Sequence, residues 1–230
     1  MTIESSGDYD SLYSIFPAHR TWPTATSDLT ALSLDTRIVR LTAGAKNFNR
    51  LPALGSLTAL WAFDINEEKL EVICKCSSLN FLFIENLKAG SLGGLSRLPN
   101  LEILGVESCS KVTSFVGLQD PRNLRGLALA NFKNVHTLDP LAQLAGPKRL
   151  DMANFYPMQE FARLSVRLKT TSCTWFQPQV NFTNLTCRKC KKATMLILTG
   201  MRKPSICGDC DSKILTRHLK DWNEALAARR

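Results

Sequence analysis

The segment LPNLEILGVESC at residues 98–109 decides the fold of this chain, because PRNLRGLALANF at residues 121–132 repeats its spacing of apolar residues. Both copies follow the pattern LxxLxxLxL with a further apolar residue three positions later, except that Val106 ends the first pattern and Pro121 begins the second, and they are 23 residues apart. A recurrence at a period of this length indicates that the chain repeats one supersecondary unit.

Weaker copies of the pattern lie on both sides of these two. One apolar position in each copy serves as a marker, and successive markers are separated by 22, 19, 22, 23 and 23 residues. Six copies at near-constant spacing are not expected by chance, and they predict a repeat region over residues 35–160. The six markers are Leu41, Phe63, Leu82, Leu104, Leu127 and Leu150.

Each copy is expected to supply one short strand whose alternate residues point into a shared core. A single unit cannot bury this apolar face, whereas stacked units bury it continuously and align their strands in parallel on one side of a curved solenoid. The repeat resembles leucine-rich-repeat proteins, nearest to the class of about 22 residues per repeat found in internalin-like proteins. The resemblance implies an α/β solenoid with a parallel sheet on its concave face.

The chain departs from the family pattern at the position that usually holds Asn, whose side chain satisfies backbone groups along the bend. Cysteine is a common substitute there, but the other residues found here are not. How the backbone groups along this edge are satisfied is therefore left open by the sequence. The residues at this position are Glu68, Leu87, Cys109, Phe132 and Phe155.

The exposed ends of a solenoid need covers. Residues 1–34 are expected to cap the first repeat, and residues 161–180 to form a C-terminal cap and connector, with a helix over residues 161–168. Residues 181–230 are expected to form a zinc ribbon followed by a helix.

Strand residues between the buried positions would face the concave side, where the resemblance implies that a partner binds. The marker Phe63 would be buried, which turns Ala62, Asp64 and Asn66 toward this side. Apolar and acidic residues together suit a protein partner with apolar and basic features. Alternatively, the aromatic residues pack on a flanking segment such as the N-terminal cap. The predicted partner-binding residues are Asp64, Phe81, Phe83, Glu85, Ile103, Glu107, Arg149 and Asp151.

Two CxxC pairs, Cys187/Cys190 and Cys207/Cys210, are separated by sixteen residues, which is typical of paired knuckles that bind one metal ion. Four thiolates give Zn²⁺ a closed tetrahedral shell with no open position, so the one zinc ion is predicted to be structural. The sequence ATMLILTG at residues 193–200 is expected to begin the hairpin of a zinc ribbon. Disulfides or free thiols are the alternative.

A helix is expected from Asp211, as its N-cap, to about Ala228, with an apolar stripe that packs on the ribbon or the arc. Leu215, Leu219 and Trp222 belong to this stripe. His218 is interpreted as a helix-surface residue rather than a metal ligand.

From residue 187 to the end of the chain, eleven Lys and Arg residues stand against four Asp and Glu residues. The net charge of +9 therefore belongs mostly to this module. Binding of RNA or DNA through the ribbon is the alternative function, and docking on an acidic protein is equally compatible with this charge. The predicted nucleic-acid contacts are Arg188, Lys189, Lys191, Lys192, Arg202 and Lys203.

Catalysis is not expected, because the three histidines, His19, His136 and His218, are widely separated and no nucleotide-binding, hydrolase or metalloprotease motif occurs. No apolar run is long enough for a membrane span, and neither a small-molecule substrate nor a membrane partner is expected. The expected role is protein binding in the cytoplasm, for example as an inhibitor or immunity protein that neutralises a toxin or effector.

Overall fold

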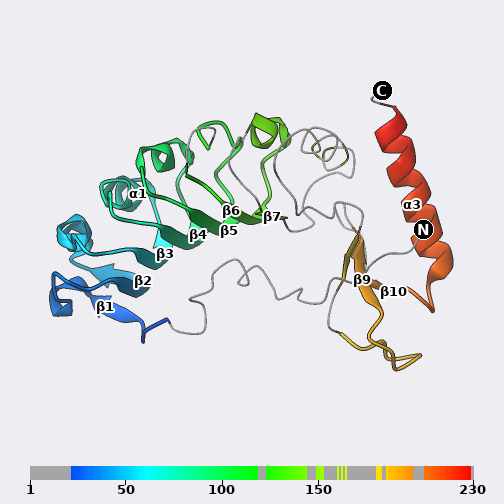
Figure 1. Cartoon of the computed structure of the whole chain (residues 1–230), viewed down its shortest axis with the longest axis horizontal. Helices are drawn as coiled ribbons and strands as arrows, with labels where there is room; N and C mark the ends of the chain where they lie inside the picture. Colours follow the sequence, from blue (N-terminus) through cyan, green and yellow to red (C-terminus); the bar gives the residue numbers. More distant parts are fainter. Residues whose placement is uncertain are drawn as a thin grey trace.

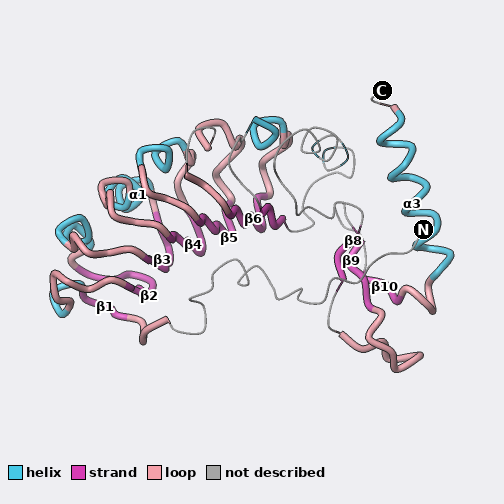
Figure 2. The backbone as a smooth tube through the Cα atoms, viewed as in Figure 1, coloured by secondary structure: helices cyan, strands magenta, loops and turns pink. Residues whose placement is uncertain are grey.

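The computed structural model describes residues 22–118, 123–143, 149–152, 160, 162, 164, 180–182, 185–198 and 205–228. These residues form an arc of parallel strands, a small antiparallel sheet and a terminal helix (Figure 1). Strands line one side of the arc, and short helices and turns line the other side (Figure 2). The predicted leucine-rich-repeat solenoid is confirmed by this arrangement.

The arc is one sheet in which each strand pairs in parallel with the next strand along the chain. The parallel register runs from one end of the described arc to the other, so every repeat adds one strand to the same sheet. The strands of this sheet are β1 (Thr26–Asp28), β2 (Ile38–Lys46), β3 (Ala59–Ile65), β4 (Phe81–Leu87), β5 (Ile103–Cys109), β6 (Gly126–Phe132) and β7 (Arg149–Met152).

The strand register corrects the predicted frame of the early repeats. Leu82 pairs with Leu60, and Leu60 pairs with Val39, so Phe63 and Leu41 are not the equivalents of Leu82. With Val39 and Leu60 as markers, the steps to Leu82 become 21 and 22 residues, which is more regular than predicted. The paired marker residues from β2 to β6 are at most 1% exposed, because they form the apolar core of the arc.

Among the described residues, the convex side carries short helical segments, since a repeat of about 22 residues leaves little chain after its strand and turns. The helix α1 (Glu67–Ile73) begins at Asn66, whose side chain accepts a hydrogen bond of 2.9 Å from the Lys69 amide. Other repeats have 3₁₀ turns in the same place. These turns are η3 (Leu29–Ala31), η4 (Phe48–Ala53), η5 (Gly93–Arg97) and η6 (Asp139–Gln143).

The position that usually holds Asn is filled by apolar residues that pack in the core. In the repeat of β3 this residue is Ile65, which pairs with Leu87, and not Glu68 as predicted. Glu68 is exposed in the first turn of α1, and Phe155 lies outside the described residues. Ile65, Leu87, Cys109 and Phe132 are each at most 1% exposed.

The residue directly before each of these apolar residues turns the backbone. Asp64, Asn86, Ser108 and Asn131 all have positive φ, between 54° and 61°. Asn and Asp adopt this left-handed conformation more readily than most residues, which explains their recurrence here. We call these four residues the left-handed ladder.

Asparagines elsewhere satisfy backbone carbonyls of the neighbouring repeat. The Asn100 amide donates to the Ser77 carbonyl at 2.9 Å, and the Asn123 amide donates to the Pro99 carbonyl at 2.8 Å. The Asn134 amide donates in the same way to a carbonyl of the preceding repeat. Asparagines at other positions thus satisfy some of the backbone carbonyls along the bend, where the usual Asn is missing.

The described part of the predicted N-terminal cap adds a strand to the sheet. In β1, Thr26 pairs with Leu41 and Asp28 pairs with Lys46, with an irregularity between them. Leu29, which follows β1, is completely buried in the core. Residues 1–21 of the predicted cap lie outside the described residues.

The C-terminal module contains a second sheet, in which β9 (Met195–Leu198) pairs antiparallel with both β8 (Val180–Phe182) and β10 (Ser205–Cys207). The hairpin of β9 and β10 is the predicted one. The strand β8 was not predicted. Of the predicted helix over residues 161–168, Ala162 and Leu164 are described, and both are helical and 1% exposed.

The helix α3 (Ser212–Ala227) connects the two apolar cores. Leu215 packs on the ribbon core, and Trp222 is 1% exposed within the core cluster of the arc. His218 is 2% exposed, so the expectation of a surface histidine is wrong: this side chain lies on the inward face of the helix. No described helix is long and apolar enough to cross a membrane.

Candidate metal centre and concave face

The four cysteines of the two CxxC pairs meet at one point of the module. All four Sγ atoms lie within 4.8 Å of one another, with 3.9 Å between Cys187 and Cys210 and 3.6 Å between Cys190 and Cys207. Tetrahedral coordination with Zn–S bonds of about 2.3 Å would place sulfur atoms roughly 3.8 Å apart. The cluster therefore has the dimensions of a four-thiolate metal site.

Each pair is held by a tight turn. In the first, the Lys191 amide donates to the Cys187 carbonyl at 2.9 Å, and Lys191 has a φ of 61°. In the second, the Asp211 amide donates to the Cys207 carbonyl at 2.9 Å. Backbone amides also point at sulfur, since the Lys189 amide lies 3.4 Å from the Cys187 Sγ, and such contacts stabilise thiolates.

Electrostatics within the cluster favour a bound cation. The Thr194 hydroxyl, 3.1 Å from the Cys207 Sγ, and the Cys210 amide lower the pKa of Cys207 to about 6. Hydrogen bonds to Cys207 and Cys190 raise the pKa of Cys210 to about 12. Four thiolates this close repel one another, so a metal ion is needed for all four to be ionised together.

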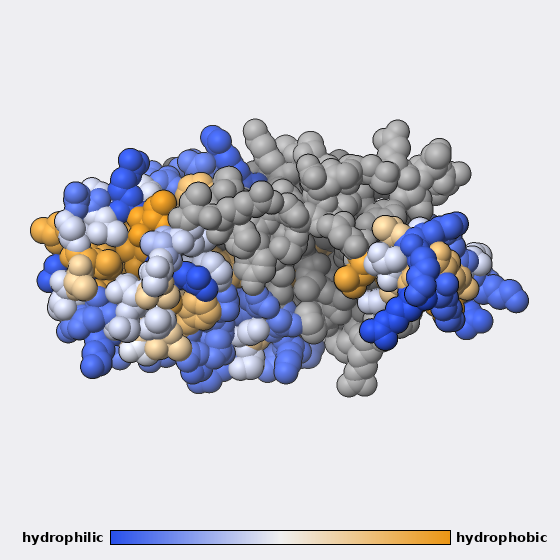
Figure 3. All heavy atoms as spheres, turned by 90° about the horizontal axis from the view of Figure 1, so that it is seen from below, coloured by the Kyte–Doolittle hydropathy of each residue, from blue (hydrophilic) through white to orange (hydrophobic). Residues whose placement is uncertain are grey.

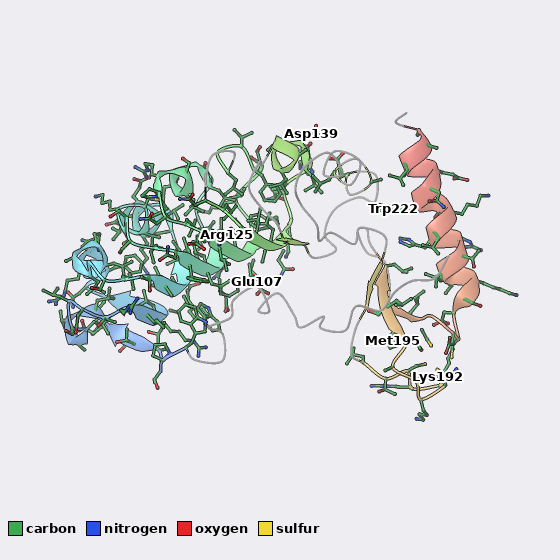
Figure 4. The ribbon with its side chains drawn as sticks, in the orientation of Figure 1. Glu107, Arg125, Asp139, Lys192, Met195 and Trp222 are labelled. Carbon is green, nitrogen blue, oxygen red and sulfur yellow. The ribbon has the colours of Figure 1, made fainter. Side chains whose placement is uncertain are left out.

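The predicted basic residues of the ribbon divide into two groups. Lys192 forms an ion pair of 3.1 Å with Asp209, which joins the two knuckles and raises the pKa of Lys192. Arg188, Lys189 and Lys191 are exposed. Arg202 and Lys203 lie outside the described residues. Figure 4 shows the position of Lys192 beside the cysteines.

The other described cysteines are core residues of the arc. Cys74, Cys76 and Cys109 are buried, and burial raises the pKa of Cys76 to about 12. In the part of the chain that is described, the four cysteines of the two knuckles are the one group of three or more His, Cys, Asp or Glu side chains that could hold a metal ion.

The concave face of the arc has rows of side chains set by the register. The middle row consists of Arg40, Trp61, Phe83, Gly105 and Ala128, with Asp151 at its end. Trp61 was not predicted on this face. The predicted marker in β3, Phe63, lies three residues after the true one, Leu60, and Ala62, predicted to face the partner, is completely buried in the arc core.

Trp61 is the centre of a cluster on this face. Its indole Nε1 donates to the Glu85 carboxylate at 2.8 Å, and the Arg40 guanidinium carbon lies 4.2 Å from the centre of its ring. The ring also makes edge contacts with Trp22 and Phe83, with centroids 5.7 Å and 5.4 Å away. Phe63 stacks on it at 5.7 Å.

The middle row is buried within this chain from Trp61 to Ala128, whereas Arg40 is half-buried. Trp61 is 9% exposed, Phe83 is 2% exposed and Ala128 is completely buried. Trp22, from the segment predicted to cap the first repeat, packs on this cluster. The flanking segment thus contributes to this cluster through Trp22, and Phe83 is too buried to offer a surface to a partner.

The outer rows remain partly accessible. Phe81 and Ile103 are half-buried on one side of the middle row, and Glu85 and Glu107 are half-buried on the other side. Figure 3, a view from below, shows apolar side chains among polar ones over the N-terminal strands, whereas the C-terminal module is mostly hydrophilic.

The acidic residues of this face differ in their surroundings. Burial raises the pKa of Glu85, against the hydrogen bond from Trp61, which lowers it. Glu107, which is labelled in Figure 4, accepts a long hydrogen bond from Asn131, at 3.4 Å. Asp64 belongs to the left-handed ladder, where it bonds to Asn86 and pairs with Lys88 at 3.3 Å.

Two predicted contacts lie at the far end of the face. Arg149 and Asp151 are in β7, where they pair with Gly126 and Ala128, and their side chains lie outside the described part of the chain.

No protein-family model matches the sequence, and no curated protein matches it. Among solved structures, an internalin (inlF) of Listeria monocytogenes is 16% identical with a TM-score of 0.48, over 61% of this chain and 42% of that chain. Internalin C2 of the same organism is 19% identical with a TM-score of 0.38, over 60% of this chain and 67% of its own. This chain therefore spans less than half of the first of these internalins. By its own strand register and buried leucine positions, the protein is a leucine-rich-repeat arc followed by a four-cysteine module that could hold a metal ion.

Proposed function

We propose that this protein is a non-enzymatic protein-binding module that recognises a partner on the concave side of its arc. The observation that carries the proposal is the pair of half-buried rows beside Trp61, in which Phe81 and Ile103 face Glu85 and Glu107 across the buried middle row. Apolar centres bordered by charges are typical of protein interfaces.

The chemistry of these rows defines the partner. Glu107 makes one long hydrogen bond and no ion pair with the described residues, so it is available to a Lys or Arg side chain. Ile103 and Phe81 would contact aliphatic groups of the same partner. One specific form of this proposal is an inhibitor or immunity protein that covers a basic site on a toxin or effector.

We further propose that the metal ion is Zn²⁺ and that its role is structural. Four thiolates favour a soft or borderline cation, and a shell closed by four protein ligands leaves no position for substrate. The sulfur separations and the amide contacts of the knuckles support this assignment. Thiols kept reduced in this way are typical of the cytoplasm, which is the proposed compartment.

Affinity capture with matched bait variants tests the proposed interface. The partner retained by the natural chain should be lost, by about tenfold or more, from an Ile103→Asp, Glu107→Lys bait, since like charges at an interface cost several kcal/mol. Glu68→Lys is the control, because Glu68 is exposed on the convex side. Equal retention by all three baits would exclude the concave face.

A second candidate function is binding of RNA or DNA through the first knuckle. The observation that favours it is the exposure of Arg188, Lys189 and Lys191 on one turn, with no ion pair to the described residues. Fluorescence anisotropy should then detect binding that weakens steeply with salt and is lost in Arg188→Ala, Lys189→Ala. The control is Lys75→Ala, Lys111→Ala on the arc, and absence of binding at low salt would remove this candidate.

A further inference from the structure

We propose that the metal centre controls the closure of the C-terminal end of the arc, and that the helix α3 transmits this control. The inference rests on the metal site of the proposed function and extends it from the ribbon to the repeats. Three observations, on the start of the helix, its length and its far end, carry it.

The start of α3 is part of the second knuckle. The Cys207 amide donates to the Asp211 carboxylate at 2.9 Å, and the Asp211 amide donates back to the Cys207 carbonyl at 2.9 Å. Asp211 was predicted to cap the helix, but its side chain makes no capping bond to the helix and binds the knuckle instead. The direction of α3 is therefore fixed by the same turn that presents Cys207 and Cys210.

The length of α3 amplifies any change at this turn. Trp222 lies eleven residues after Asp211, which is roughly 16 Å along a helix with a rise of 1.5 Å per residue. A tilt of about 20° at the knuckle would move the indole by roughly 6 Å. This displacement exceeds the separation of about 4 Å between heavy atoms of apolar side chains in contact. A modest rearrangement of the cysteines is thus enough to withdraw Trp222.

The far end of α3 belongs to the same apolar cluster as the core of the arc, a cluster that also includes Ala162 and Leu164. Trp222 is 1% exposed, and Ala225 and Leu226 pack against the same apolar cluster. At the C-terminal end of the described repeats this cluster includes Leu138 and Leu141, each at most 1% exposed. Figure 1 shows α3 beyond this end of the arc, with the ribbon beside its first turn.

A solenoid is stabilised by contacts between neighbouring repeats, and its terminal repeat needs a cover. Without the ion, the two knuckles are no longer joined and the orientation of α3 is lost. The repeats at the C-terminal end of the arc should then open locally, while repeats several neighbours away keep their contacts.

Hydrogen exchange followed by mass spectrometry on the full chain tests this inference. Treatment with a chelator, or Cys190→Ser, should accelerate amide exchange by at least about tenfold in residues 123–143 and 212–227, and leave residues 59–87 unchanged. Lys213→Gln, which changes an exposed side chain of α3, is the control that should keep the metal and the protection.

A second variant separates the helix from the metal. Trp222→Ala should retain one metal ion per chain and yet accelerate exchange in residues 123–143 as metal loss does. Protection of residues 123–143 that survives both metal loss and Trp222→Ala would overturn the inference, and so would equal acceleration in residues 59–87. A protein purified without metal would overturn the metal site as well, whereas affinity capture tests the partner surface independently.

Discussion

The arc and the four-cysteine module differ in what stabilises their folds. The arc repeats one apolar layer, so its stability is the sum of many similar contributions from neighbouring repeats. The module has few buried aliphatic residues, and a core of that size does not stabilise a fold alone. Damage to the arc should therefore be graded by position, whereas damage to the module should be nearly all-or-none. The buried aliphatic residues of the ribbon core are Leu196, Leu198 and Ile206.

Of the changes considered, loss of the metal should destabilise the fold most, and it should do so in the module. Cys190→Ser should abolish stoichiometric metal binding and melt the ribbon, because structural zinc supplies about 10–16 kcal/mol in small zinc modules. Elemental analysis and the NMR signals of residues 185–198 measure this. Cys109→Ser makes the same chemical change in the arc core and should retain the metal; a folded, metal-free Cys190→Ser ribbon would refute the difference between the two regions.

A deletion of core volume in the arc should have a large but partial effect. Leu104 is completely buried in β5, at the centre of the sheet, so Leu104→Ala should lower the free energy of unfolding by about 2–5 kcal/mol. Denaturant titration measures the change. Val116→Ala, at a side chain that is 56% exposed, should stay within about 0.5 kcal/mol. Similar losses in both variants would contradict the layered core.

A glycine contact between convex turns should have an intermediate effect. Gly117 has a φ of 98°, and a Cβ there would lie 2.5 Å from the Cα of Gly93. Gly117→Ala should therefore destabilise the arc by more than about 1 kcal/mol, which thermal unfolding detects as a lower Tm. Gly55→Ala has open space and no positive φ, so its Tm should be unchanged or slightly higher.

The smallest effects should come from two carboxylates of the arc with opposite pKa shifts. The pKa of Glu85 is raised above 4.5 by burial, so the folded protein holds this proton more tightly and loses stability as pH rises through the raised pKa. Glu85→Gln should remove this loss. The free energy of unfolding of Glu85→Gln, measured relative to that of the natural chain, should therefore rise between pH 4 and pH 8.

Asp28 should behave in the reverse manner. Hydrogen bonds from Asn47 and Thr30 lower its pKa from 3.8 to about 2, so its contribution is present above pH 4 and is lost as pH falls toward 2. Asp28→Asn should lower the Tm at pH 7 and have a much smaller effect near pH 2. An equal pH dependence for the variants at Asp28 and Glu85 would contradict the assigned surroundings.

The repeat and the four cysteines were predictable because both are encoded by spacing. The segment at residues 98–109 allows one frame, since its leucines recur at the spacing of the repeat and Gly105 and Glu107 flank Val106. In β3 the sequence LWAFDI is apolar at consecutive positions, so either Ala62 or Phe63 can occupy the core. Only pairing with β4 decides between them, and Trp61 was therefore missed as a concave residue.

Other features depend on contacts between distant segments and leave no local pattern. The strand β8 is three residues long, and its pairing with β9 defines it. His218 has the sequence context of a surface residue, yet α3 is covered on two faces. The burial of Phe83 depends on what lies over the sheet, and a periodic sequence cannot report that.

The left-handed ladder also limits how this chain can diverge. Asp64, Asn86, Ser108 and Asn131 need residues that tolerate positive φ, so substitution there is restricted whatever the protein binds. The positions directly before them on the concave side, such as Glu85 and Glu107, carry no such restriction. In descendants of this chain, new binding specificity should therefore evolve at the residues directly before the left-handed ladder, while the ladder itself changes little. The same positions of the arc are the ones to randomise when new binding specificity is engineered.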